Sequence, residues 1–350
     1  MTAAAKRKLL AWYAAERRDL PWRRPERAGD SYAVWVSEVM LQQTRVAAAE
    51  GYYRRFLGRF PRLAALAAAK ESEVLALWSG LGYYRRARQM WRTARAVRAA
   101  GSDALPEVFA ELLALPGFGR YTAGAVLSIA RQQPYPAVDG NIRRVLWRLA
   151  GRALTGAEAE AAGRDWLDLR RPGDSNQALM ELGAMVCLPR RPRCGECPIR
   201  RWCRDRGRDP GLTARARRAA EAVREEYWLV VREGRVRLRR RAAAEALLPG
   251  MWELPRRAAG DRGGRLLGTV RHAITFRTIK AAVYAPTPGT PAPPGRWWTR
   301  SECERLPLTG LAQKILRRWA KGTQEPAGAA QTAGFPSRKS DAAASRGAHA

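Results

Sequence analysis

One carboxyl group stands out in the stretch VSEVMLQQT, residues 36–44, because its neighbours are apolar. At helical spacing Val34, Trp35 and Leu41 surround Glu38, so its side chain is expected on a buried helix face. Burial without a partner favours the neutral form of a carboxyl group, which moves its pKa from about 4.3 towards about 6–7. Such a group can donate a proton to a substrate near neutral pH.

A second carboxylate occurs in PAVDGN, residues 136–141. Asp139 is followed by Gly140, and Asp-Gly is a common turn that by itself indicates no chemistry. Two carboxylates in different environments can, however, divide acid catalysis and charge stabilisation between them. Taken alone, Asp139 is better interpreted as part of an ordinary turn, and it remains a candidate only in company with the other motifs.

Four cysteines gather in CLPRRPRCGECPIRRWC, residues 187–203, at spacings C-x6-C-x2-C-x5-C. Disulfides are rare inside cells, so a metal site is the better interpretation. Zinc sites usually present two C-x2-C pairs, whereas a compact run of four thiolates suits an iron-sulfur cluster. The cluster is favoured, with zinc and chance spacing as alternatives, and its ligands would be Cys187, Cys194, Cys197 and Cys203. Cys303 lies far away and is expected to be an ordinary cysteine.

The stretch LPGFGRYTAG, residues 115–124, predicts a hairpin between two helices. Pro116 ends the first helix, Gly117 and Gly119 form the turn, and the second helix begins near Arg120. Glycines let the backbone approach a ligand closely, and the start of a helix offers unpaired N–H groups to an anion. The hairpin is a candidate phosphate site, with a generic helix connection as the alternative.

The 350-residue chain carries 64 Lys and Arg against 32 Asp and Glu, a net charge of +32. This excess favours nucleic acid as a partner over a merely basic soluble protein. The only histidines are His272 and His349, which excludes most histidine-based metal sites and triads. No apolar run approaches the ~20 residues that cross a bilayer, so no membrane association is expected.

Four segments follow one another along the chain. Residues 1–207 show apolar positions at helical spacing between proline and glycine breaks, which predicts an all-helical domain. Residues 208–224 are charged and poor in large apolar side chains, which predicts a linker that ends in a short helix. Strand patterns, a Glu-Gly turn and one helix predict a smaller α+β domain at 225–320. Residues 321–350, rich in Ala, Gly, Ser and Thr, are expected to be disordered.

Together these stretches resemble the helix-hairpin-helix DNA glycosylases, and among them the adenine DNA glycosylases, which remove adenine mispaired with 8-oxoguanine. The resemblance spans residues 7 to about 320 and rests on the joint order of LPWR (20–23), VSEVMLQQT, GLGYYRRAR (80–88), LPGFGRYTAG, VDGN and the cysteine loop. It implies an all-α helix-hairpin-helix glycosylase domain with an iron-sulfur loop, followed by a smaller α+β Nudix-like domain. The implied cofactor is a 4Fe-4S cluster.

The resemblance also implies roles for individual residues. Glu38 would be the catalytic acid, and Asp139 would stabilise the positive sugar either electrostatically or through a covalent bond. Tyr121 and Asn141 occupy supporting positions, although Tyr121 suits simple packing as well. The expected DNA-binding residues probe the duplex or hold phosphates: Gln42, Gln43, Thr44, Tyr83, Gly117, Gly119 and Arg120.

The second domain contains LLPGMWELP, residues 247–255, which is typical of the Nudix-like recognition domain in this family, but no intact Nudix hydrolase signature. It is expected to recognise the opposite base. The family's Phe-Ser-His stretch corresponds here to Ile274, Thr275 and Phe276, so Thr275 keeps a hydroxyl while the histidine is lost. We therefore expect a preference for 8-oxoguanine over guanine that is smaller than usual in the family.

The expected function is release of adenine opposite 8-oxoguanine or guanine, by a monomer bound to double-stranded DNA in the bacterial cytoplasm. Two alternatives remain. An endonuclease III-like pyrimidine glycosylase and lyase would carry a catalytic lysine where this chain has Tyr121, and would lack Glu38. A non-enzymatic iron-sulfur protein would bind DNA without releasing a base.

Overall fold

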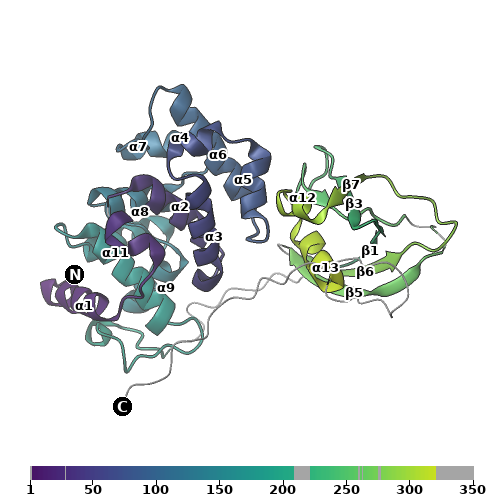
Figure 1. Ribbon diagram of the computed structural model, residues 1–350. Coiled ribbons are helices and arrows are strands. Elements are labelled where there is room, and N and C mark those ends of the chain that lie inside the picture. Colours follow the sequence, from purple (N-terminus) through teal and green to yellow (C-terminus); the bar gives the residue numbers. More distant parts are fainter. Residues whose placement is uncertain are drawn as a thin grey trace, which may run out of the picture. The chain divides into compact units, whose positions relative to one another are not determined.

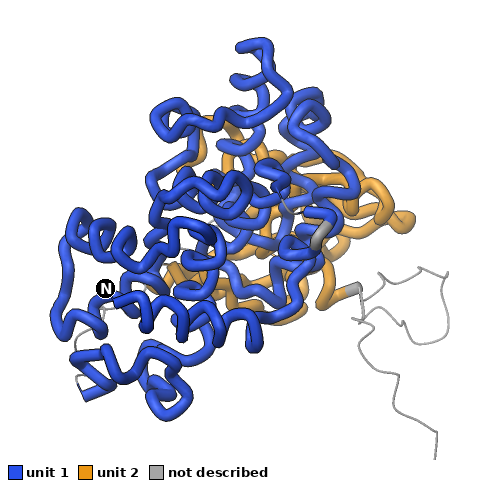
Figure 2. Tube along the Cα trace, turned by 90° about the vertical axis from the view of Figure 1, so that its left-hand side faces the viewer, with its two compact units in different colours: residues 1–217 blue, residues 218–350 orange. Residues whose placement is uncertain are grey.

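The computed structural model describes residues 2–27, 29–208, 221–258, 261, 263–274 and 277–320. The chain divides into two units, residues 1–217 and 218–350, drawn blue and orange in Figure 2. Each unit is described by itself. In the described residues no helix combines the length and the apolar character that crossing a membrane requires.

The first unit is built from helices, as the sequence predicts (Figure 1). Short 3-10 turns and one π-helical turn connect or extend the α-helices. The elements are α1 (Ala3–Glu16), η1 (Pro21–Arg23), η2 (Pro25–Arg27), α2 (Ser31–Leu41), α3 (Val46–Arg59), α4 (Leu63–Ala68), α5 (Glu71–Trp78), α6 (Arg85–Ala99), α7 (Phe109–Ala114), α8 (Arg120–Arg131), α9 (Gly140–Ala150), α10 (Gly156–Trp166), α11 (Pro172–Glu181), η3 (Leu182–Val186) and η4 (Arg200–Trp202).

Helix α2 is the central helix of this unit. Asp30 caps its start by accepting a hydrogen bond from the Ala33 amide at 3.0 Å, and every residue from Ser31 to Met40 is buried. A helix that is buried all round must be enclosed by other helices. It packs against α8, and Trp35 stacks on Phe118, with ring centroids 5.4 Å apart. The central position of α2 is what puts one of its side chains deep inside the protein.

A second core joins α1, α9, α10 and α11. It is formed by apolar residues such as Leu9, Ile142, Leu146, Trp166 and Leu179. The cysteine loop that follows η3 packs against this core through three of its four cysteines. The loop is therefore attached to the same helices that line the candidate site described below.

The predicted hairpin joins α7 to α8, and α8 begins at Arg120 as the sequence indicates. Gly117 adopts a φ of +82°, and a Cβ atom there would lie 2.7 Å from Cβ of Gln89. Only glycine satisfies both the left-handed backbone and this close approach. The Thr93 hydroxyl donates to the Pro116 carbonyl at 2.5 Å and holds the turn against α6.

The second unit is α+β. Its elements are β1 (Glu221–Trp228), β2 (Val231–Arg232), β3 (Arg235–Arg240), β4 (Trp252–Glu253), β5 (Arg265–Ile274), β6 (Arg277–Ala285), β7 (Arg296–Thr299), α12 (Arg300–Glu304) and α13 (Gly310–Ala320). One sheet has the order β1-β6-β5, with β1 parallel and β5 antiparallel to β6. The other has the order β2-β3-β4, and β7 pairs with β3. Apolar residues of both sheets and α13 share one core.

Two expectations for this unit need correction. Residues 221–224 were expected in a linker ending in a short helix, but they begin β1, which pairs with β6 in parallel register. Ala and Arg favour a helix locally, and pairing with a distant strand overrides that preference. The pattern after 225 also predicts a single hairpin, whereas β1 and β2 belong to different sheets. The predicted Glu233–Gly234 turn is confirmed between β2 and β3. Most of the expected linker and the 321–350 tail lie outside the described residues.

We expect Gly117→Ala to lower the free energy of unfolding more than Gly101→Ala. Both glycines have a φ of +82°, so both alanines should cost about 1 kcal/mol in backbone strain. Only the residue at 117 would also collide with Gln89, whereas a Cβ at 101 meets nothing within 4 Å. Urea denaturation of the two variants measures the difference, and equal losses would show that the hairpin does not pack on α6 as described.

Candidate active site

A cavity of about 1130 Å³ lies in the first unit between α2, α8, α9 and α11. Most of the predicted catalytic and DNA-binding residues of this unit line it: Glu38, Gln42, Gln43, Thr44, Tyr121, Asp139 and Asn141. The predicted residues outside its lining are Tyr83, Gly117, Gly119, Arg120 and the four cysteines of the loop. The structure thus brings together residues that lie about a hundred positions apart in the chain.

Glu38 lies on α2 and is only 5% exposed, as its apolar neighbours predict. Burial raises the pKa of its carboxyl group to about 7. The neighbouring charge of Asp139 acts in the same direction, while the hydrogen bond from Tyr121 and the charge of Arg23 oppose it. A substantial fraction of Glu38 is therefore protonated at neutral pH, as proton donation requires.

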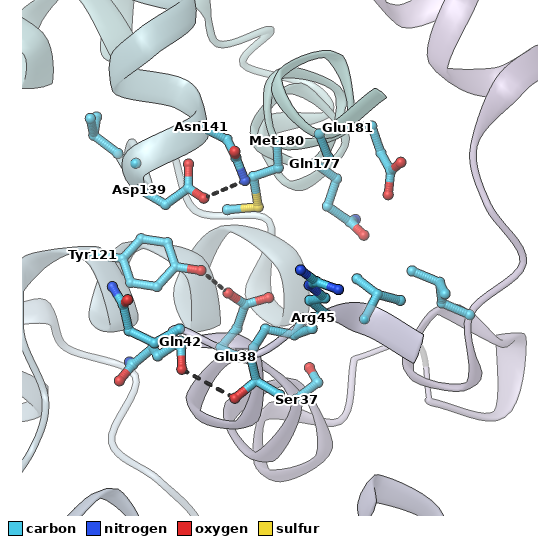
Figure 3. A pocket seen from close by; sticks show the side chains of 18 of the residues that line it. Ser37, Glu38, Gln42, Arg45, Tyr121, Asp139, Asn141, Gln177, Met180 and Glu181 are labelled. Atoms are coloured by element: carbon cyan, nitrogen blue, oxygen red, sulfur yellow. Dashed lines mark hydrogen bonds between the residues drawn. The ribbon is translucent and has the colours of Figure 1, made fainter. Parts of the chain in front are cut away.

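Tyr121 lies in the first turn of α8, directly after the hairpin, and its hydroxyl donates to Oε2 of Glu38 (Figure 3). Burial and the Glu38 carboxylate raise the pKa of Tyr121 well above 10. The phenol therefore stays protonated and remains a donor. Tyr121, for which a supporting position is expected, thus contacts Glu38 directly.

Asp139 faces the cavity from the start of α9, across from Glu38 (Figure 3). It caps this helix, because Oδ1 accepts from the Ile142 amide at 2.7 Å. Oδ2 accepts from Nδ2 of Asn141 at 3.1 Å. Burial raises the pKa of Asp139, whereas these hydrogen bonds and the charge of Arg144 lower it. The carboxylate is thus held in one orientation by its own helix.

Arg144, which the sequence analysis did not single out, joins this carboxylate to the cysteine loop. Its Nη2 donates to Oδ1 of Asn141 at 2.9 Å and to the Gly183 carbonyl at 2.6 Å. Its Nε donates to the Cys187 carbonyl at 2.8 Å. A Cβ at Gly183 would lie 2.6 Å from Cβ of Asn141, so the π-helical turn before Cys187 fits closely against the start of α9.

The four loop cysteines are free and share one local environment. Burial raises the pKa of the Cys197 thiol to about 11, and the other three thiols act in the same direction. Nη1 of Arg148 donates to Sγ of Cys187 at 3.3 Å, and the Arg206 amide donates to Sγ of Cys203 at 3.3 Å. Donors directed at sulfur suit thiolates that bear negative charge.

Comparison with known proteins places these features in a family. Residues 36–167 match the HhH-GPD superfamily of base excision DNA repair proteins. The adenine DNA glycosylase of Mycolicibacterium smegmatis is 44% identical over 217 residues, which cover 59% of this chain and 72% of that protein. The chain belongs to the adenine DNA glycosylase family.

This chain spans a smaller share of the other relatives. The adenine DNA glycosylases of Mus musculus and Homo sapiens are 48% identical over 57% of this chain, which spans only 41% and 39% of those proteins. A solved thermostable thymine-DNA glycosylase aligns with a TM-score of 0.54 and 26% identity, over 58% of this chain and 95% of that one. An endonuclease III-DNA complex, at 21% identity and a TM-score of 0.50, shares the fold of the helical unit.

The cysteine loop matches the iron-sulfur binding domain of endonuclease III over residues 187–203. Its cofactor is a 4Fe-4S cluster, and the matched range contains all four predicted cysteine ligands. A cube takes one thiolate at each corner, so its sulfurs stand further apart than the ligands of one zinc ion. In the described ranges, no group of three or more His, Cys, Asp or Glu side chains is arranged to hold a metal ion. A cluster bound by the four cysteines would cross-link the loop.

A buried acid on α11 was missed by the sequence analysis. Glu181 is 1% exposed, and it pairs with Nε of Arg18 at 2.8 Å and with Nη1 of Arg23 at 2.6 Å. Nε of Arg23 also donates to Gln177 at 3.0 Å. All four residues line the cavity. The signal that revealed Glu38, an acid among apolar helical neighbours, is also present around Glu181.

The expected DNA-binding residues lie in three turns. Gln43 and Tyr83 both have left-handed backbones, with φ of 60° and 49°, and both side chains are exposed. Nε2 of Gln42 donates to Oγ1 of Thr122 at 3.3 Å, which ties it to α8. In the hairpin, Arg120 forms two 2.5 Å hydrogen bonds with Glu160, so its guanidinium already has an acidic partner. Thr275 lies outside the described residues.

We expect purified protein to absorb broadly across the visible range, and Cys194→Ser to lose most of its iron and to bind duplex DNA more weakly. The reason is that one thiolate fewer leaves a corner of the cube without its protein ligand and loosens the loop. Cys303→Ala is the matched control, because Cys303 is buried in the other unit and should leave the iron content unchanged. A colourless protein with stoichiometric zinc would contradict the assignment.

Proposed function

We propose that this protein is a monofunctional DNA glycosylase that hydrolyses the N-glycosidic bond of adenine mispaired with 8-oxoguanine or guanine. The observation that carries the proposal is the pairing of two unlike carboxyl groups across one cavity. Burial holds the pKa of Glu38 near 7, and three hydrogen-bond donors hold the Asp139 carboxylate in place. Such a pair supplies an acid and an anion at the same reacting bond.

Adenine is a poor leaving group until its ring is protonated. In the proposed reaction, Glu38 gives its proton to the adenine ring, and the C1′–N9 bond breaks as the base departs neutral. The proton of Tyr121 remains on its oxygen throughout, because its pKa lies well above the working range. Tyr121 thus orients the Glu38 carboxyl group.

Bond cleavage leaves positive charge on the sugar. Asp139 is placed to stabilise that charge, and Asn141 and the Ile142 amide keep its two oxygens in position. Glu38, now ionised, accepts a proton from water, whose hydroxyl adds to C1′. The acid is then restored. Whether Asp139 acts as an ion or through a transient ester, the balance of atoms is the same.

The absence of an amine at position 121 favours hydrolysis over strand cleavage. A lyase step needs a nucleophilic amine that forms a Schiff base with the sugar. Here the phenol of Tyr121 is bound to Glu38 instead. This distinguishes the proposal from an endonuclease III-like lyase, and Glu38 and Asp139 distinguish it from a non-enzymatic DNA-binding protein.

Duplex DNA is the proposed partner. A net charge of +32 attracts a polyanion, and the start of α8 at the hairpin offers backbone N–H groups to a phosphate. The adenine must leave the stack to reach a cavity inside the helical unit, which costs a few kcal/mol. At the far side of the cavity, Gln177 and Glu181 offer polar groups to a purine edge.

We also propose that the second unit is a Nudix-like module that recognises the opposite base. In LLPGMWELP, Glu253 is buried and pairs with Arg239 and, at 2.6 Å, with Arg241. A carboxylate so occupied is structural, which favours recognition over hydrolysis. Thr275, which follows Ile274 in the sequence, is the proposed contact for the lesion.

Glu38→Gln should lower the single-turnover rate of adenine release by about 10²–10⁴-fold, because it keeps the shape of the side chain but removes the proton. Duplex affinity, measured by anisotropy, should change little. A near-normal rate would mean that Glu38 is only structural.

The rate of the wild-type protein should fall as pH rises through about 7, because protonated Glu38 is the active form. It should also fall at acid pH as Asp139 becomes protonated. Tyr121→Phe removes a hydrogen bond that lowers the pKa of Glu38, so the alkaline limb should move to higher pH. If the alkaline limb of the Tyr121→Phe profile stays in place or moves to lower pH, the assignment of that limb to Glu38 is contradicted.

Thr275→Ala should reduce the preference for adenine opposite 8-oxoguanine over adenine opposite guanine. Losing one hydrogen bond is worth on the order of 1 kcal/mol, or a few-fold to tenfold in the ratio of rates. Thr278→Ala, in the adjoining strand β6, is the matched control. If neither substitution alters the ratio, the opposite base is recognised elsewhere.

A further inference from the structure

Arg86 is a buried cation near the start of α6, only 8% exposed. Its Nη1 donates to the carbonyls of Val39 at 2.6 Å and Met40 at 3.0 Å, and also to that of Gln42. Its Nη2 donates to Oγ1 of Thr44 at 3.2 Å and to the Gly82 carbonyl at 3.2 Å. One guanidinium therefore holds two separate segments, 39–44 and the turn at 82.

The first segment is the end of α2. The last carbonyls of a helix have no partner within it, and they form the negative end of its dipole. A cation placed there can donate hydrogen bonds to these carbonyls and is attracted by the negative end of the dipole. Arg86 consequently ends the helix that carries Glu38 and sets the path of the three residues that follow.

The second observation is backbone strain on both segments. Gln43 and Tyr83 are non-glycine residues with φ of 60° and 49°. Each such conformation is strained and persists only where surrounding contacts enforce it. Contacts from Arg86 reach Gln42 and Thr44, on either side of Gln43, and Gly82, directly before Tyr83.

The ring of Tyr83 is held as well. The guanidinium of Arg86 lies 5.3 Å from its centroid and 5.4 Å from that of Trp78. Tyr83 is nevertheless 48% exposed, so the ring has one face on the cation and the rest open. Burial lowers the pKa of Arg86 to about 10, and no carboxylate is among the influences on it. A cation buried against carbonyls and rings is costly, which argues for a geometric role.

We propose that Arg86 is the positioning residue of the duplex-probing surface: it locks Gln43 and Tyr83 together, so that both side chains enter the base stack as one rigid unit when adenine is extruded. The proposal rests on the function proposed above. Extrusion of a paired base is unfavourable, and a preordered pair of side chains offsets that cost without losing further entropy on binding. Without the contacts from Arg86, the two turns would have to become ordered each time the protein binds DNA.

The test uses the full chain with its cluster, and a duplex with adenine opposite 8-oxoguanine and 2-aminopurine as the 5′ neighbour. In a Glu38→Gln background, fluorescence reports unstacking without cleavage. Arg86→Lys keeps the charge but loses the planar set of donors. We expect the fluorescence rise to be largely lost, and adenine release with Glu38 intact to slow about 10- to 100-fold. Arg92→Lys, an exposed site on the same helix, should change neither.

A double-mutant cycle separates this role from general support of the fold. If Arg86 acts through Tyr83, then Arg86→Lys and Tyr83→Ala should be strongly non-additive in the release rate, and additive losses would overturn the proposal. Tyr83→Ala removes an exposed ring, so it remains available if Arg86→Lys lowers the melting temperature. In that case Tyr83→Ala and Gln43→Ala must be non-additive with each other, and additivity would again overturn it.

Three further outcomes are decisive. If the alkaline limb of the pH–rate profile shifts in Arg86→Lys, then Arg86 acts on Glu38 and not on the probing turns. That result would overturn the proposal. If wild-type protein unstacks the duplex but releases no adenine, the proposed function fails while the role of Arg86 stands. If it neither unstacks the duplex nor releases adenine, both fail.

Discussion

The burial of Glu38 is the constraint on which the rest of the helical unit depends. A pKa raised from 4.5 to about 7 corresponds to roughly 3 kcal/mol of disfavoured ionisation. The folded state binds this proton more tightly than the unfolded state, so stability is lost as pH rises from about 4.5 to about 7 and stays reduced above. The enclosure of α2 on all sides causes this cost, and the hydrogen bond from Tyr121 to the carboxyl group reduces it.

That donor connects the chemistry to the proposed phosphate site. Tyr121 stands in the first turn of α8, and this turn begins where the hairpin ends. A shift of the hairpin on α6 would therefore move the hydroxyl that orients Glu38. On the opposite wall, Arg144 connects Asn141, and through it Asp139, to the backbone around Cys187. Each carboxyl group is thus supported by an element that is proposed to contact DNA or that belongs to the cysteine loop.

The site combines satisfied groups with strained ones. Asp139 makes ordinary capping hydrogen bonds, and Glu181 has two arginine partners. Gln43 and Tyr83, in contrast, have left-handed backbone conformations that residues other than glycine rarely adopt. Both strained residues have exposed side chains, and Gln43 also lines the cavity together with Asp139 and Glu181. Among the residues proposed to act in this site, the strained backbones are those of the two that would act on the duplex.

The sequence by itself determined whatever depends on local pattern. Apolar spacing around Glu38 predicted its burial, the Pro-Gly turn predicted where α8 begins, and the cysteine spacing favoured an iron-sulfur cluster. The strand pattern predicted the β2–β3 turn in the same way. In each case the residues that decide the outcome lie within a few positions of one another.

Only the tertiary structure decided contacts between distant segments. Tyr121 and Glu38 are 83 positions apart, Arg18 and Glu181 are 163 apart, and Arg86 lies more than 40 positions from the carbonyls it holds in 39–42. The first four residues of β1 look helical until β6, over fifty positions later, pairs with them. A hydrogen bond or a strand pairing depends on which surfaces meet once the helices and sheets have packed, and local periodicity carries no record of that meeting.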